Sequence, residues 1–177
     1  MMRNTCPYGA PNARDLCGRT LYLVDIENMV GSSAPTRSEV AQVERRICAA
    51  VQPCAGDHTV VAASHHNALA MSLGWTGTAQ RKWRSGIDGA DLALLEAVAD
   101  IPWIAERYRR VVIASGDHTF TFAVASLRAA GVEVIVIRPD IGFSSALRRA
   151  AGPNVVSLGS RLPANVVNLF THTKDAA

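Results

Sequence analysis

The chain has 177 residues, of which 49% are hydrophobic and 19% are charged, and its formal net charge is +3. This composition is typical of a folded globular protein and excludes an intrinsically disordered chain. The length suits one domain that can bury a sizeable core. The small basic excess is compatible with an anionic partner but does not require one.

The cysteines and the apolar runs exclude further classes of protein. None of the four cysteines forms a C-x-x-C pair or has zinc-finger spacing to a histidine, so no zinc site is predicted. No apolar run approaches membrane-spanning length, and the first twenty residues lack the apolar core of a signal peptide. We therefore expect a cytoplasmic protein with no membrane contact.

Short apolar runs alternate with segments of helical periodicity along most of the chain. The runs are rich in β-branched residues and lack polar alternation, which is typical of strands buried on both faces of a parallel sheet. The predicted strands are 20–25, 59–64, 80–84, 110–114, 132–137 and 154–158. Helices are predicted from Thr36 to before Pro53, over 68–73, after Gly86 up to a break at 101–103, from Phe120 to Gly131, and over 144–150.

This alternation of strand and helix, with short connections, predicts an α/β fold. Its central sheet is expected to be mostly parallel, with helices on both faces. We assign residues 20–160 to this domain. Residues 1–19, which are rich in Pro, Gly, Asn and Arg, are expected to be a flexible leader, and 161–177 a tail with room for a short helix.

Three aspartates are expected to gather at one edge of the sheet. Asp25 directly follows the first strand, Asp117 follows the strand 110–114, and Asp91 stands at the start of a helix. In open α/β sheets, ligands bind at the carboxyl ends of the strands. Clustered carboxylates repel one another unless a cation neutralises them, and oxygen ligands without Cys or His favour Mg²⁺ or Mn²⁺. The sequence therefore predicts a divalent-metal site suited to phosphodiester hydrolysis by a metal-bound water.

Two polar residues beside these aspartates complete the predicted site. Asn28 lies three residues after Asp25, where its amide could hydrogen-bond a carboxylate, a metal-bound water or substrate. Ser115 and the amides around Gly116 are placed to bind an anionic oxygen. The structural alternative is that the aspartates are helix N-caps or first-turn acids, which would require three separate coincidences at one edge.

A basic segment surrounds a tryptophan in the predicted strand 80–84. Its sequence is Gln-Arg-Lys-Trp-Arg. Arginine and tryptophan together suit the phosphates and base faces of a nucleic acid. Edge strands also carry Lys and Arg simply to prevent aggregation. The sequence does not decide between these two interpretations.

Three stretches resemble motifs of the NYN family, a branch of the PIN-like nucleases. Residues 23–28 are similar to its hydrophobic-D-x-x-N opening, 89–94 to its K-G-x-D-x-x-L element, and 113–120 to its S-G-D-x-D-F signature. The strand–helix–strand pattern from 131 to 158 fits the closing part of the family. The resemblance runs from about residue 20 to 160, and the order and spacing of the motifs agree with the family.

The resemblance implies a Rossmann-like PIN fold and a metal-dependent endoribonuclease that uses Mg²⁺ or Mn²⁺. The implied catalytic residues are Asp25, Asn28, Asp91, Ser115 and Asp117. The three aspartates are the implied metal ligands, with Asp88 as an additional candidate. The expected RNA contacts are Arg81, Lys82, Arg84, His118 and Thr119. The oligomeric state stays open, a homo-oligomer included.

The sequence departs from the family pattern at two positions. Thr119 replaces the second acid of S-G-D-x-D-F, and the lysine of K-G-x-D-x-x-L is absent from its place before Asp91. Asp88 or Glu27 could replace the lost acid, and His118 could act as a base or a phosphate contact. Two alternatives therefore remain. One is a catalytically weakened PIN-like RNA-binding module. The other is a phosphatase with an Asp nucleophile, which the sequence disfavours because it lacks Asp-x-Asp after the first strand.

Overall fold

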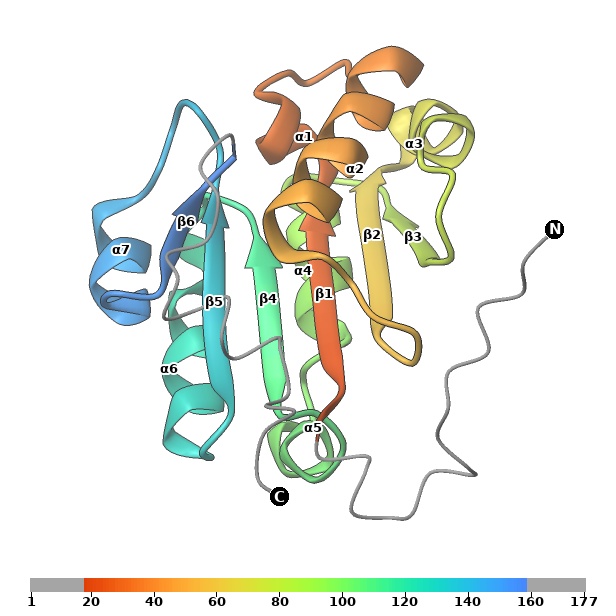
Figure 1. The fold of residues 1–177 in the computed structure, drawn as a ribbon. Coiled ribbons are helices and arrows are strands. Elements are labelled where there is room, and N and C mark those ends of the chain that lie inside the picture. Colours follow the sequence, from red (N-terminus) through yellow and green to blue (C-terminus); the bar gives the residue numbers. More distant parts are fainter. Residues whose placement is uncertain (1–17, 159–177) are drawn as a thin grey trace, which may run out of the picture.

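Six parallel strands form one sheet in this computed structural model, which describes residues 18–158. The strand order is β3-β2-β1-β4-β5-β6 (Figure 1). The strands are β1 (Thr20–Asp25), β2 (His58–Ser64), β3 (Gln80–Arg84), β4 (Arg110–Ala114), β5 (Glu133–Arg138) and β6 (Val155–Ser157). The predicted parallel α/β sheet is confirmed, and every strand end lies within one residue of its predicted position. Most of the predicted leader and the whole of the predicted tail, 161–177, lie outside the described residues.

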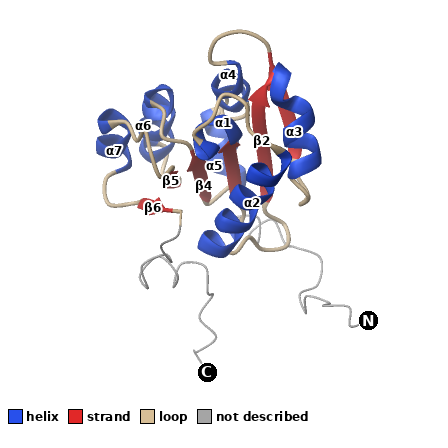
Figure 2. Ribbon diagram, turned by 90° about the horizontal axis from the view of Figure 1, so that it is seen from above, coloured by secondary structure: helices blue, strands red, loops and turns tan. Residues whose placement is uncertain are grey.

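Helices cover both faces of this sheet, as predicted (Figure 2). One face is covered by α1 (Ile26–Val30), α2 (Arg37–Val51) and α3 (Ala68–Gly74). The other is covered by α4 (Gly89–Glu96), α5 (Ile101–Arg107), α6 (Thr121–Ala129) and α7 (Ser145–Ala151). Two 3₁₀ turns, η2 (His65–Asn67) and η3 (His118–Phe120), precede α3 and α6. No helix among residues 18–158 is long and apolar enough to cross a membrane.

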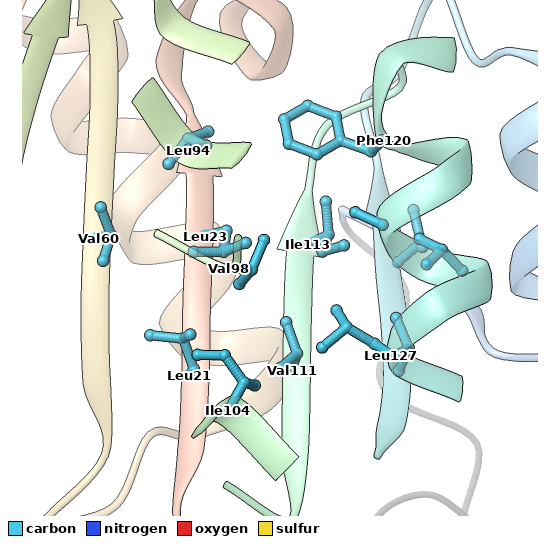
Figure 3. Close-up of a cluster of buried hydrophobic side chains, with 14 of the residues drawn as sticks. Leu21, Leu23, Val60, Leu94, Val98, Ile104, Val111, Ile113, Phe120 and Leu127 are labelled. Carbon is cyan, nitrogen blue, oxygen red and sulfur yellow. The ribbon is translucent and has the colours of Figure 1, made fainter. Parts of the chain in front are cut away.

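The sheet separates two apolar cores, and each central strand contributes side chains to both. Leu21 and Leu23 of β1 pack toward α4–α7, and Tyr22 and Val24 pack toward α1–α3. Figure 3 shows the first of these cores, where Ile113 of β4 lies beside the β1 leucines. Because successive residues of a strand point to opposite faces, a strand buried on both sides has no polar alternation. Each such side chain contributes roughly 1.5–3 kcal/mol to folding when fully buried. The rigid sheet therefore fixes the positions of the loops that leave its carboxyl edge.

The short helix α1 was not predicted. The sequence indicated a loop after Asn28, but the chain turns into a helix directly at the end of β1. Asp25 caps this helix, and Gly31 ends it in the left-handed conformation at φ 74°. A helix of five residues is too short to show an apolar period. As a result, Asp25 and Asn28 lie on one helical turn instead of on an open loop.

The expected break at residues 101–103 proved to be the start of a helix. The preceding helix α4 already ends at Glu96, and α5 begins at Ile101. Asp100 caps α5 by accepting a hydrogen bond from the Trp103 N–H at 3.0 Å. Pro102 lies in the first turn, where its missing N–H costs no helical hydrogen bond. The prediction was wrong because proline was interpreted as a helix breaker, although it is also common at a helix start.

Candidate active site

The candidate site lies where the strand order of the sheet reverses, between β1 and β4. The chain goes from β1 to β2 on one side and from β4 to β5 on the other, so the loops diverge and leave a crevice at the carboxyl edge. In the register of the two strands, Val24 pairs with Ala114, so Asp25 and Ser115 follow at the same level. The Ser115 hydroxyl donates to Asp25 Oδ2 at 3.3 Å. The predicted meeting of these two strand ends is therefore observed.

Asp25 and Asn28 tie β1 to the loop that follows β4. Asp25 is 3% exposed, and its Oδ1 accepts the N–H of Asn28 at 3.1 Å. The Asn28 side-chain oxygen accepts the N–H of Gly116 at 2.6 Å. Asn28 thus holds in place the backbone next to Asp117, which is one physical reason for an asparagine three residues after the aspartate.

Asp91 lies next to Asp25, in the first turn of α4. It is 8% exposed, and its Oδ1 is buried without a hydrogen-bond partner among the described residues. Burial raises the pKa of Asp91 to about 6. A hydrogen bond with Asp25 opposes this increase, and the charges of Asp117, Asp88 and Glu27 add to it. Burial, followed by repulsion from Asp91, raises the pKa of Asp25 well above its usual value. Two carboxyl groups so placed cannot both hold a negative charge at low cost.

Asp117 is bonded to η3, the 3₁₀ turn that follows it. Its Oδ1 accepts hydrogen bonds from the backbone N–H of Thr119 at 2.7 Å and from the Thr119 hydroxyl at 2.5 Å. His118 Nδ1 lies 3.0 Å from the same oxygen. Burial acts to raise the pKa of Asp117, but these hydrogen bonds and the His118 charge outweigh it, so the pKa is lowered. Asp117 is therefore ionised at neutral pH.

Ser115 joins Asp25 to the backbone of Asp117. Its hydroxyl accepts the N–H of Asp117 at 3.2 Å while donating to Asp25. The residue is 0% exposed. The sequence predicted that this hydroxyl would contact phosphate or water, whereas in this structure it is enclosed and bonded to the chain itself.

The carboxylates fit a divalent ion as a pair. Among residues 18–158, no three His, Cys, Asp or Glu side chains converge closely enough to hold one ion together. Mg²⁺ is commonly bound by one or two carboxylates, and waters and substrate phosphates complete its octahedron. The mutual repulsion of Asp25 and Asp91 and the unpartnered Asp91 Oδ1 suit such an ion. Asp117 is bonded to Thr119 through Oδ1 alone, so Oδ2 is the oxygen through which it could join them.

The two residues considered as replacements for the lost acid are placed differently. Asp88 is exposed, has φ 56°, and caps α4 without a side-chain hydrogen bond. Glu27 Oε1 is occupied, because it accepts the Ser64 N–H at 2.8 Å, the Asn67 amide at 2.6 Å and the Ser64 hydroxyl. Glu27 therefore ties α1 to the end of β2.

Two residues that were not predicted for the site, Ser64 and Asn67, bind Glu27 at the end of β2. They are 8% and 5% exposed. Asn67 also donates to the Ser33 carbonyl at 2.8 Å. Ser64 is the first polar residue at the end of the buried strand β2, which is the same signal that identified Asp25 and Asp117. That signal could have found it.

The predicted RNA contacts lie on both sides of the carboxylates. Arg81 donates to the carbonyls of Trp75 at 2.7 Å and Ala79 at 3.3 Å, and Arg84 pairs with Glu96. His118 is exposed at the rim with 79% of its side chain accessible. Of the predicted cations, Arg81 is thus used to hold a loop of its own chain.

Comparison with known proteins agrees with the fold. No curated protein matches the chain. The family model described as NYN domain matches residues 19–158. The match covers more than half of the chain and includes all the candidate residues described above. The chain therefore belongs to the NYN domain family, a family of PIN-like nuclease domains.

Proposed function

We propose that this protein is a metal-dependent endoribonuclease that hydrolyses RNA phosphodiester bonds at the edge between β1 and β4. The observation that carries the proposal is the pair of buried carboxyl groups of Asp25 and Asp91, with Asp91 Oδ1 lacking a hydrogen-bond partner among residues 18–158. Leaving two acids in contact without a compensating cation is costly, so a nuclease domain that keeps them has a use for the cation.

Each residue of the site has a part in this function. Asp25 and Asp91 would hold Mg²⁺ or Mn²⁺, with Asp117 as the candidate for a third ligand. A bound ion would lower the pKa of a coordinated water and offset the charge of the phosphate. Asn28 and Ser115 keep Asp25 and the Gly116 backbone in register. Asp117 is ionised and lies at the rim, where it can accept a hydrogen bond from the attacking water.

A second candidate is an RNA-binding module without turnover. The observation that favours it is Thr119, which stands where the family motif has an acid. Both of its donors are bonded to Asp117 Oδ1. Threonine at this position supplies no charge for a metal or a water. The module would then bind RNA through its basic residues in a salt-dependent manner.

Cleavage of single-stranded RNA distinguishes the two candidates. We expect Mg²⁺ or Mn²⁺ to support cleavage, EDTA to abolish it, and Asp117→Asn to lower the rate by roughly 10²-fold or more, as for loss of one preorganised polar group. Glu106→Gln on α5, an exposed acid at the opposite end of the sheet from the site (Figure 1), is the matched control and should leave the rate unchanged. A near-wild-type rate for Asp117→Asn would rule out the site as assigned. Salt-dependent binding with no product in either metal would support the binding module instead.

A further inference from the structure

The exposed tryptophan of the edge strand β3 is not explained by protection against aggregation. Lys82 and Arg84 are the charges that keep an edge strand from pairing with another chain. Trp83 lies between them and is 51% exposed. A large exposed apolar side chain on an edge invites association, so it works against that protection. Trp83 is therefore a candidate contact for a ligand.

The side chains around Trp83 form a shallow cleft with one available cation. A cavity of about 380 Å³ is lined by Arg81, Lys82, Trp83 and Arg84 of β3 and by Ala93 and Glu96 of α4. The Arg81 guanidinium is bonded to loop carbonyls, and Arg84 is paired with Glu96. Lys82 has no hydrogen-bond or ion-pair partner in the described part of the chain. Lys82 and Trp83 are successive strand residues and point to opposite faces of the sheet, so a ligand reaches both the ammonium group and the aromatic ring only by lying along the open edge.

This cleft lies close to the paired carboxyl groups of Asp25 and Asp91, here called the acid pair. A Cβ on Gly89 would lie only 2.3 Å from the Arg84 carbonyl oxygen, so α4 begins in contact with the end of β3. Asp91 stands in the first turn of that helix. A chain lying along β3 toward its carboxyl end would therefore approach Asp91.

We propose that the open edge of β3 is a subsite for unpaired RNA, with Lys82 at a phosphate and Trp83 stacked on a base. The inference rests on the proposed function, because it takes RNA as the ligand. The base must be unpaired, since both faces of a base are covered in a duplex. A second copy of the chain is a poor occupant, because pairing two β3 strands would bring like charges opposite one another.

The test measures binding without cleavage. The full chain is titrated in EDTA into a labelled single-stranded RNA and into a duplex of equal length, with anisotropy as the readout. We expect Trp83→Ala to weaken single-strand binding about tenfold, as for loss of one stacked base, and Trp83→Phe to restore most of it. Duplex binding should not change. Trp103→Ala is the matched control, because Trp103 is 43% exposed on α5 and lies against Arg107.

The possible outcomes separate this inference from the proposed function. Unchanged single-strand affinity in Trp83→Ala, or an equal loss on the duplex, overturns the subsite even if metal-dependent cleavage is observed. A tenfold loss that Phe rescues supports the subsite even if no cleavage is found. If sedimentation instead shows that Trp83→Ala converts a dimer to a monomer, and RNA binding stays intact, the edge is a self-association surface and the inference is wrong.

Discussion

The acid pair makes a quantitative prediction for Asp91→Asn. The substitution keeps the shape of the side chain and removes one of the two repelling charges. Burial raises the pKa of Asp91 from 3.8 to about 6. Because one pKa unit corresponds to about 1.4 kcal/mol, this shift amounts to at most about 3 kcal/mol. Water at the sheet edge screens part of it, so we expect Asp91→Asn to stabilise the metal-free protein by about 1–2 kcal/mol at pH 7.5.

The sign of the effect follows from proton linkage. A folded-state pKa above the unfolded value contributes stability that is fully present below the unfolded pKa and is lost as the pH rises through the folded pKa. The contribution of Asp91 should therefore disappear between about pH 4 and pH 6, and the advantage of the Asn variant should appear over the same range. At pH 4 the two proteins should be nearly equal in stability.

Urea unfolding at pH 4 and pH 7.5, with and without Mn²⁺, measures these quantities. The ion should stabilise the wild type at pH 7.5, by about 2.7 kcal/mol at one hundred times its Kd, and should have little effect on Asp91→Asn. Glu106→Gln is the control, because Glu106 is an exposed acid on α5 that does not act on the pKa of Asp91 or Asp25. If metal-free Asp91→Asn were less stable than the wild type at pH 7.5 and equal to it at pH 4, the reasoning about the acid pair would be refuted.

Two further predictions concern the loop that carries Asp117. Gly116→Ala should lower the free energy of unfolding by about 1–3 kcal/mol and should also lower activity, because the added Cβ would lie 2.6 Å from the Gly142 carbonyl oxygen and overpack the loop. Thermal unfolding measures this effect, with Gly18→Ala as the control because a Cβ there meets open space. Thr119→Val should lower the free energy of unfolding by about 1 kcal/mol at pH 7, because it removes the hydroxyl that donates to the ionised carboxylate of Asp117. Because the pKa of Asp117 is lowered, this cost should fade as the pH drops through that pKa. A cost independent of pH would contradict the assigned hydrogen bond.

Most of the fold could be predicted because it depends on short-range patterns. The strands contain β-branched runs, and the long helix α2 starts where predicted, with Thr36 as N-cap in a capping box with Glu39. The errors occurred where a local signal had two meanings. Pro102 suits either the interruption or the first turn of a helix, and Asp25 either follows a strand or caps a helix.

The site could be predicted only to the level of which residues meet. The parallel register places Asp25 beside Ser115, and this follows from the strand pattern. The directions of the side chains do not follow from it. Asp117 bonds to Thr119, two residues on, because of its rotamer. Glu27 bonds to Ser64 and Asn67, which are 37 and 40 residues away. Arg81 was predicted to contact RNA for its charge alone, and its bonds to loop carbonyls depend on a turn that no motif marks.

Thr119 changes the balance of charge at the edge of the sheet. An acid at this position would add repulsion to Asp117, and through it to a pair whose pKa values are already raised. Threonine instead adds a hydroxyl donor to the backbone N–H that already bonds Asp117, and it stabilises the ionised form of Asp117. The buried negative charge is then confined to Asp25 and Asp91, and two negative charges match one divalent ion. The replacement of the fourth acid is therefore compatible with a site that works with a single metal ion, and it makes the metal-free edge less costly to fold.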